Sequence, residues 1–404
     1  MKVLFLTLAR IENIEAQGIY SDLLRVFRDK GHQVTIVNPL ERKFSKSTSY
    51  YSDNGVNILN VWTTNIQKTN FLEKGFTTLF IELFFYLAIK KYLPKEKFDL
   101  ILYSTPPITF TNLIRRIKER SNAKTYLLLK DIFPQNAVDL NVFKKQSLIY
   151  KYFRRKEKLL YDLSDFIGCM SPANLTYVLE NNPTVKKEKV EINPNSIEIK
   201  KEVLEINPAL YEKYKIPNDK VIFIFGGNLG KPQSIDILKN HILYCRSIEN
   251  AFFLIVGYGT EYQNLYKWIK HSEIKNVRLI KELPKNDYDQ IISLSHVGLI
   301  FLNPHFTIPN FPSRLLSYMQ NKLPVICATD ACTDIGKIAC ENNFGFSCLT
   351  SDLESFFDNV VKLLNAEVRN QMGENAFQYL QKEYNVEQSY NIIINKFNQS
   401  WEIF

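Results

Sequence analysis

VIFIFGGNLGKPQSIDIL, residues 221–238, contains a buried-strand pattern, a glycine-rich turn and the start of a helix. Gly226, Gly227 and Gly230 would let the backbone approach a ligand closely, and Lys231 stands directly after the turn. The glycine spacing is neither G-x-G-x-x-G nor a P-loop, so it indicates no dinucleotide or ATP site. Two alternatives stay open: a turn whose lysine binds a diphosphate, or an ordinary strand–helix turn with a solvated lysine.

Strands and helices alternate in the same way on both sides of this stretch. In the first half, strand patterns are expected at residues 3–9, 32–38, 56–63, 98–104, 123–131, 165–171 and 189–196. In the second half they are expected at 221–228, 251–259, 277–282, 297–303, 324–329 and 344–349. This alternation predicts an α/β protein of two Rossmann-like, doubly wound parallel-sheet domains that face a cleft. Ligands are expected in that cleft, beyond the carboxyl ends of the strands.

The chain has 404 residues, too many for a single hydrophobic core, so two domains are expected. A charged linker at about 197–218 separates the two halves. We therefore predict a first domain over 1–198 and a second over 199–384. The final helix, about 385–404, is expected to pack back on the first domain.

Composition narrows the class of partner. Apolar residues make up 45% of the chain, as in folded globular proteins, and the formal net charge is +9. Nucleic-acid motifs are lacking, which leaves anionic lipid or a phosphorylated substrate as partners. The six cysteines have no C-x-x-C spacing, so we expect small buried thiols in a reducing cytosol and no metal cluster. MKVLFLTLAR at the N-terminus predicts a first strand rather than a signal peptide.

A second candidate for phosphate binding is FPSRLLSYMQ, residues 311–320. Pro312 fits an N1-like helix position, Ser313 offers a hydroxyl and Arg314 adds a fixed cation. A helix N-terminus carries unpaired N–H groups and a partial positive charge, so it suits a phosphate. The alternative is an ordinary capped helix.

In the first half, Asp131 stands at the carboxyl end of the strand expected over 123–131. A carboxylate there could act as a base or bind an acceptor hydroxyl, or it could cap the following segment. Gly257, at the end of the strand over 251–259, is typical of ordinary turn chemistry.

Two stretches combine basic and aromatic residues, 76–97 and 141–161. Such stretches can lie on an anionic bilayer as amphipathic helices. The alternatives are a buried helix for the first and a solvated charged face for the second.

Several of these stretches together resemble the GT-B glycosyltransferases of the large retaining family (family 4-like) that builds capsule, O-antigen and related polysaccharides. The resemblance is strongest to members acting on lipid-linked sugars, such as N-acetyl-fucosamine transferases. The matching stretches occur in order over nearly the whole chain: GHQVTIV (31–37), STPPI (104–108), KDIFPQNAV (130–138), NPNSIEI (193–199), FGGNLGKPQSIDIL (225–238), FLIVGYGTE (253–261), VRLIKELPKNDYDQIISLSHVGLIFL (277–302) and PSRLLSYMQNKLPVI (312–326).

The resemblance implies roles for individual residues. Asp131, Lys231 and Arg314 are the implied catalytic residues, with Asp131 near the acceptor and the reacting sugar. The implied donor-binding residues are Gly18, Gly227, Asn228, Lys231, Gly257, Glu282, Leu283, Pro284, Asn310, Ser313, Arg314, Leu315 and Ser317. Among them Gly18, Lys231 and the segment 313–315 would meet the diphosphate, and the segment 283–284 would meet the nucleobase.

Two positions depart from the family pattern. The family often carries two glutamates eight residues apart, one for the donor sugar and one for the ribose, where this chain has Pro309 and Ser317. A serine lacks the charge-assisted hydrogen bond of a carboxylate, a difference of ~1–2 kcal/mol in donor binding. Asn310 or Glu282 could replace the ribose contact.

The activity implied is metal-independent, retaining transfer of a sugar from a UDP-sugar to a lipid-linked or polysaccharide acceptor, with no cofactor. The donor could be an N-acetylated deoxy amino sugar, and the enzyme would lie on the cytoplasmic face of the cell membrane. A non-catalytic scaffold of a membrane polysaccharide complex is the alternative suggested by Pro309 and Ser317. A nucleotide-sugar epimerase is a third reading, for which His241 and His305 are the available histidines.

Overall fold

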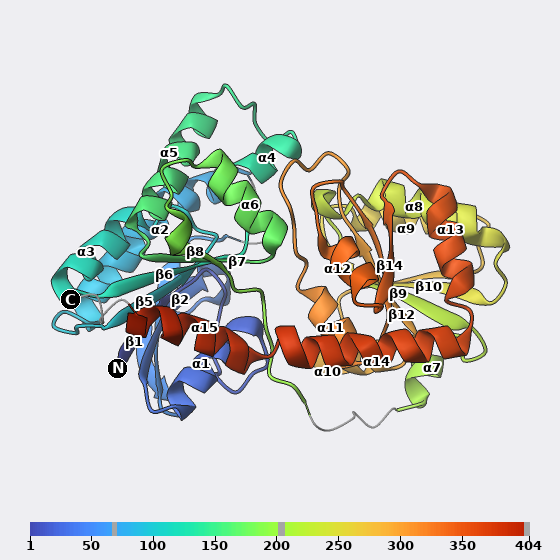
Figure 1. Cartoon of the computed structure of the whole chain (residues 1–404), viewed down its shortest axis with the longest axis horizontal. Coiled ribbons are helices and arrows are strands. Elements are labelled where there is room, and N and C mark those ends of the chain that lie inside the picture. The colour runs from blue at the N-terminus through green and yellow to red at the C-terminus, as the bar shows by residue number, and fades with distance from the viewer. Residues whose placement is uncertain (67–70, 201–206, 400–404) are drawn as a thin grey trace. The chain divides into compact units, whose positions relative to one another are not determined.

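The computed structural model describes residues 1–66, 71–200 and 207–399, and the side chains of residues 71–76 lie outside that description. The chain divides into two compact units. The first unit is 1–198 together with the chain from Asn385, and the second unit is Ile199–Tyr384. Each unit has its own sheet and core (Figure 1).

The first unit contains an eight-stranded sheet with the order β3-β4-β2-β1-β5-β6-β7-β8. Its strands are β1 (Lys2–Leu6), β2 (Gln33–Glu41), β3 (Ser49–Asp53), β4 (Val56–Thr63), β5 (Leu100–Ser104), β6 (Lys124–Leu129), β7 (Phe166–Cys169) and β8 (Val190–Ile192). All neighbours pair in parallel except β3, which runs antiparallel to β4 at the edge. The sequence analysis missed β3 because its residues alternate between half-buried and exposed and form no apolar run.

Helices cover both faces of this sheet. They are α1 (Ile19–Asp29), α2 (Phe71–Tyr92), α3 (Thr111–Ser121), α4 (Gln135–Asp139), α5 (Leu148–Leu163), α6 (Pro172–Asn181) and α15 (Val386–Gln399). Buried side chains of α2, α3, α5 and α6 share one core, and those of α1 and α15 share another. The C-terminal helix α15 packs on α1, where the Tyr390 and Phe27 ring centroids are 4.8 Å apart.

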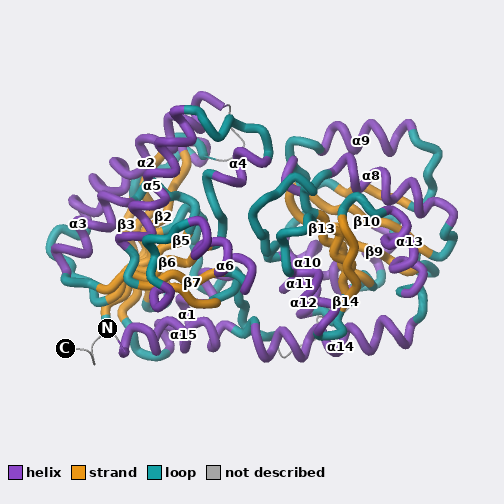
Figure 2. Tube along the Cα trace, turned by 45° about the horizontal axis from the view of Figure 1, so that its top comes forward, coloured by secondary structure: helices purple, strands orange, loops and turns teal. Residues whose placement is uncertain are grey.

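The second unit contains a fully parallel six-stranded sheet with the order β11-β10-β9-β12-β13-β14 (Figure 2). Its strands are β9 (Val221–Asn228), β10 (Ala251–Tyr258), β11 (Val277–Ile280), β12 (Val297–Phe301), β13 (Val325–Thr329) and β14 (Gly345–Leu349). Its helices are α7 (Ala209–Lys213), α8 (Ile235–Tyr244), α9 (Tyr262–His271), α10 (Lys285–Ser293), α11 (Arg314–Gln320), α12 (Ile335–Glu341), α13 (Leu353–Lys362) and α14 (Ala366–Glu383). The reversal of strand order between β9 and β12 makes this a doubly wound sheet, in which ligands bind beyond the carboxyl ends of the strands.

Both units are therefore Rossmann-like, and the α/β fold class predicted from the sequence, GT-B, is confirmed. The stretch 197–218 predicted as a charged linker contains the short helix α7 (Ala209–Lys213), and its residues 201–206 lie outside the described residues. The expectation of buried thiols holds for Cys169, Cys245 and Cys327 but is wrong for Cys332 and Cys340, which are exposed. Cys340 lies on the outer side of the amphipathic helix α12, where the residue type alone did not reveal its orientation.

Candidate active site

Two glycines, Gly226 and Gly227, stand near the carboxyl end of β9, so the backbone at these positions carries no side chain. Gly227 has φ +111°, a conformation that favours glycine, and a Cβ on Gly226 would come within 2.0 Å of the Tyr288 hydroxyl oxygen. The Gly226 N–H donates to the Tyr318 hydroxyl at 3.1 Å, which holds α11 against the strand end. The glycines of the quoted stretch thus allow two tyrosines to pack at the strand end while the adjoining Gly227 backbone stays exposed.

Arg314 begins α11 and lies across this strand end. Its guanidinium carbon is 4.5 Å from the Phe225 ring centroid, a cation–π geometry that fixes the side chain. Its Nη1 is buried and has no hydrogen-bond partner among the described residues. A Cβ on Gly227 would lie 3.7 Å from Nη2, so the guanidinium is close to the exposed glycine backbone. A buried, unpaired guanidinium N–H is costly, and a phosphate oxygen is the acceptor that it fits best.

Helix α11 contributes less than the sequence predicted. It begins at Arg314 with Ser313 as N-cap, two residues after the predicted start at Pro312. The Leu315 and Leu316 N–H groups already donate to the carbonyls of Pro312 and Ser313, at 3.2 and 3.1 Å. The side chain of Leu315 is fully buried and belongs to the core. The Ser313 side chain is exposed and makes no capping bond.

Lys231 begins a short 3-10 turn directly after the glycines and is exposed. Asn228 is also exposed, and its amide donates to Gln233 Oε1 at 3.3 Å. Gly257 has a structural reason to be glycine, because a Cβ there would come within 1.9 Å of the Gly227 carbonyl oxygen. The close pairing of β9 and β10 explains this glycine without a ligand.

The segment 282–284 joins β11 to α10 at the same edge of the sheet, with Pro284 as the N-cap residue of α10. Glu282 and Pro284 are exposed and Leu283 is partly buried, so an apolar side chain is accessible to a base. Asn310 donates from its backbone to Thr333 Oγ1 and from its side chain to the Ile308 carbonyl, both at 3.1 Å. Asn310 is therefore held in place within its own loop.

Ser317 lies on α11 three residues after Arg314 and is partly buried. Residues three apart on a helix lie on the same face, so Ser317 adjoins the candidate phosphate position. We predict that Ser317→Glu tightens UDP binding about tenfold, because a carboxylate accepts a charge-assisted bond from a ribose hydroxyl. Calorimetric titration with UDP and with 2′-deoxy-UDP checks this, since the gain should be smaller for the deoxy nucleotide. Equal weakening for both nucleotides would show that the glutamate neutralises Arg314 instead.

In the first unit, polar side chains follow the carboxyl ends of β1, β5 and β6. Thr7 and Ser104 share a hydroxyl–hydroxyl bond of 3.1 Å. The Thr105 hydroxyl accepts from the Lys130 and Asp131 N–H groups, at 3.0 and 3.2 Å, and donates to the Asp131 carbonyl at 3.1 Å. Thr105 thereby fixes the backbone of Lys130 and Asp131.

The Asp131 carboxyl is the candidate reactive group of this edge. It is exposed to solvent, yet dense protein around it raises its pKa from 3.8 to about 6 through desolvation. It does not cap α4, whose N-cap position is occupied by Pro134. The capping alternative for Asp131 is therefore wrong, and the carboxylate remains available to a substrate hydroxyl.

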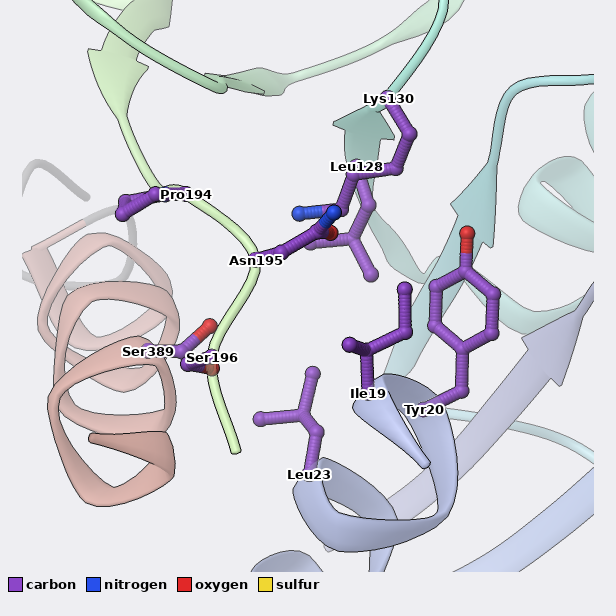
Figure 3. Close-up of a pocket in the computed structure, with 9 residues that line it drawn as sticks. All are labelled: Ile19, Tyr20, Leu23, Leu128, Lys130, Pro194, Asn195, Ser196 and Ser389. Carbon is purple, nitrogen blue, oxygen red and sulfur yellow. The ribbon is translucent and has the colours of Figure 1, made fainter. Parts of the chain in front are cut away.

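Two residues beside Asp131 were not singled out from the sequence. Tyr20, in the first turn of α1, hydrogen-bonds to Ser104, and burial raises its pKa to about 12. Burial lowers the pKa of Lys130 to about 7, and its Nζ donates to the Asn193 carbonyl at 3.3 Å. Both line a small pocket with Asn195, whose amide oxygen is buried and has no partner within the described part of the chain (Figure 3). The position of Lys130 next to Asp131, at the end of a buried strand, was the signal that could have found it.

Gly18 is the N-cap residue of α1, at the same edge of the sheet, and its N–H donates to Asp22 Oδ1 at 2.9 Å. No side chain caps the helix there. For the residues that the structure describes, no group of three or more His, Cys, Asp or Glu side chains is arranged to hold a metal ion. The cationic side chains that the candidate sites offer include Lys130 in the first unit and Arg314 with Lys231 in the second.

Comparisons with known proteins agree with this geometry. Residues 207–379, nearly all of the second unit, match the family described as Glycosyl transferases group 1. The chain is 24% identical over 335 residues to the probable glycosyltransferase WbjE of Pseudomonas aeruginosa, a match that covers 78% of this chain and 80% of that protein. The similarity to group 1 glycosyl transferases therefore lies in the second unit.

Solved structures share the fold over the whole chain. Sucrose-phosphate synthase from Thermosynechococcus elongatus has a TM-score of 0.76 at 15% identity, covering 100% of both chains. Anabaena Alr3699/HepE, solved in complex with UDP and glucose, has a TM-score of 0.69 at 14% identity, covering 99% of this chain and 100% of that one. At these identities the similarity shows the GT-B fold alone. The substrate has to be inferred from the residues of the site.

Proposed function

We propose that this protein is a glycosyltransferase that moves a sugar from a nucleoside-diphosphate sugar to an acceptor hydroxyl. The donor is bound by the second unit at the β9–α11 edge, and the acceptor is bound by the first unit at the Asp131 edge. The observation that carries the proposal is the buried, unpaired Nη1 of Arg314 beside the exposed backbone of Gly227. The family match of residues 207–379 supports it.

In the proposed reaction, the acceptor oxygen forms a bond to the anomeric carbon while the bond from that carbon to the diphosphate breaks. The acceptor hydroxyl donates its single hydrogen to the ionised Asp131, which takes that proton as the new bond forms and releases it to solvent after the diphosphate has left. Arg314 and Lys231 stabilise the negative charge that develops on the diphosphate. Because these two side chains can supply the positive charge, we propose that no metal ion is needed. The resemblance described from the sequence leads us to propose also that the anomeric configuration is retained.

For the donor we propose a UDP-sugar, and within this class we propose an N-acetylated deoxy amino sugar. The neighbour HepE was solved with UDP and glucose, which supports uridine as the base. For the acceptor we propose a lipid-linked saccharide in bacterial surface polysaccharide synthesis, with the protein on the cytoplasmic face of the membrane. The similarity to the probable glycosyltransferase WbjE supports sugar transfer, and the acceptor rests on the resemblance described from the sequence.

The two alternative functions, a nucleotide-sugar epimerase and a non-catalytic scaffold, differ in the support that the residues give them. His241 is buried between the rings of Phe301 and Phe356, and its Nδ1 bonds to the Ile237 carbonyl at 2.9 Å. This histidine is a core residue, which removes one of the two that an epimerase could have used. A non-catalytic scaffold keeps some support from Ser317 and Pro309, where the family often has glutamates.

Calorimetric titration with UDP, GDP, dTDP and CMP, first without and then with Mg²⁺, tests the proposal. We expect micromolar binding of UDP without metal, because the cations of the β9–α11 edge need an anionic partner. Binding of a different nucleotide would keep the transferase and change the donor. Failure of all four to bind would overturn the proposed donor site and put the scaffold first.

A further inference from the structure

The helix α2 exposes an apolar stripe on the first unit. Leu79, Phe80, Leu83 and Leu87 are 55%, 41%, 47% and 53% exposed, and their spacing places them on one side of the helix. The opposite side packs on the sheet through Ile81, Phe85 and Ile89. The sequence alternatives for this segment were a bilayer-surface helix or a buried helix, and the described part of α2 is buried on one side and about half exposed on the other.

Helix α5 extends the stripe. Leu148, Ile149 and Tyr152 at its start are 82%, 52% and 41% exposed. Two contacts connect α5 to α2 through the start of α3. Glu82 of α2 accepts from the Asn112 and Leu113 N–H groups, at 2.6 and 2.8 Å, and Lys156 of α5 donates to the Thr111 hydroxyl at 3.2 Å. Burial raises the pKa of Tyr152 and the nearby charge of Glu82 raises it further, so this part of α5 lies near α2.

The charges around the patch are arranged with one sign outward. In α2 from Thr77 to Tyr92 the single acid is Glu82, and it is bonded to α3. In α5 the acid Glu157 is buried and paired with Arg154 at 2.5 Å, and the exposed acid Asp162 lies in the last turn, away from the start of the helix. The exposed basic residues are Lys90, Lys91, Lys144, Lys145, Lys151, Arg155 and Lys158. Exposed leucines and aromatics on segments that also carry exposed lysines and arginines complement an anionic bilayer, where apolar side chains enter and cations meet headgroups.

We propose that the α2–α5 patch is a docking surface for an anionic lipid bilayer. The patch would bring the protein to a lipid-linked acceptor, and this consequence rests on the proposed function. The binding of the patch to a bilayer does not depend on that function. Every helix of the described residues is too short or too polar to cross a membrane. Binding would therefore be peripheral, through insertion of the apolar stripe together with attraction of the basic residues to the lipid headgroups.

Vesicle flotation with the full chain tests the proposal without any sugar substrate. We expect the protein to float with vesicles of phosphatidylcholine mixed with phosphatidylglycerol and to stay unbound with phosphatidylcholine alone. Leu83→Ser with Leu87→Ser should lower partitioning about tenfold or more, because two inserted leucines are lost. Lys144→Glu with Lys145→Glu should lower it by about tenfold, through loss of headgroup attraction.

Matched controls lie on the second unit. Leu349→Ser with Val361→Ser removes apolar side chains that are 53% and 44% exposed, and Lys270→Glu with Lys275→Glu reverses two exposed lysines. Both controls should float like the original protein. The proposal is overturned if the original protein ignores anionic vesicles, or if the patch variants bind as tightly as the controls. The nucleotide titration would still decide the transferase proposal in that event, because it needs no lipid.

Discussion

Replacing Asp131 by asparagine is expected to slow sugar transfer by two to three orders of magnitude while nucleotide binding stays unchanged. The amide keeps the shape of the carboxyl group but cannot accept a charge-assisted bond from the acceptor hydroxyl, a loss of about 10²–10⁴-fold for a group of this kind. Steady-state turnover with a nucleotide sugar and a lipid-linked acceptor gives the rate, and calorimetry with UDP gives the donor affinity.

The dependence of the transfer rate on pH should follow the ionisation of the same carboxyl group, Asp131. Desolvation raises the pKa of Asp131 to about 6, so the reactive, ionised form is lost as the pH falls through that value. We expect the acid limb of kcat/KM to fall near pH 6 in the original protein and to be absent from the residual activity of the Asp131→Asn variant.

Stability separates this role from a structural one. A folded-state pKa above the ordinary 3.8 means that the native state binds the proton more tightly than the unfolded chain, so this group stabilises the fold in acid and less as the pH rises through about 6. Asp131→Asn should therefore unfold at an equal or higher temperature than the original protein at neutral pH. A lower unfolding temperature would assign Asp131 a structural role. Asp162→Asn, an exposed carboxyl of the same unit, should leave both rate and stability unchanged.

Replacing Arg314 by methionine is expected to weaken UDP binding by about 100-fold, roughly 2–3 kcal/mol, because a charged, buried donor loses its phosphate partner. Methionine can still pack on the Phe225 ring, where the guanidinium now lies. Arg314→Lys should fall in between, since it keeps the charge but not the planar fork. Calorimetric titration of the variants with UDP measures the loss.

Uridine without phosphates provides the internal control for the Arg314 variants. Its weak binding should be the same in the original protein and in Arg314→Met, because we propose that the nucleobase is bound by the segment 283–284 and not by Arg314. Arg246→Met removes an exposed guanidinium of the same unit and should bind UDP normally. If Arg314→Met loses uridine and UDP alike, the substitution has disrupted the unit; if it loses neither, the phosphate position lies elsewhere.

The outward face of α2 illustrates what local sequence cannot decide. Its residues are apolar nearly all round, so the helical periodicity that separates a buried side from an exposed one is weak. Packing of Ile81, Phe85 and Ile89 on the sheet leaves the opposite leucines about half exposed. The sequence showed that the segment is basic. It did not show which side of α2 faces solvent.

The sequence by itself determined the two parallel sheets, because runs of buried apolar residues separated by amphipathic helices are local patterns that need no partner to be recognised. It also located Asp131, Lys231 and Arg314, since all three follow strand ends or begin a helix. Only the tertiary structure decided that the Arg314 guanidinium lies on Phe225 with an unpaired nitrogen, and that Tyr20 adjoins the Asp131 edge. Those neighbours come from elements far apart in the chain, and parallel strand order, not sequence distance, brings their ends together.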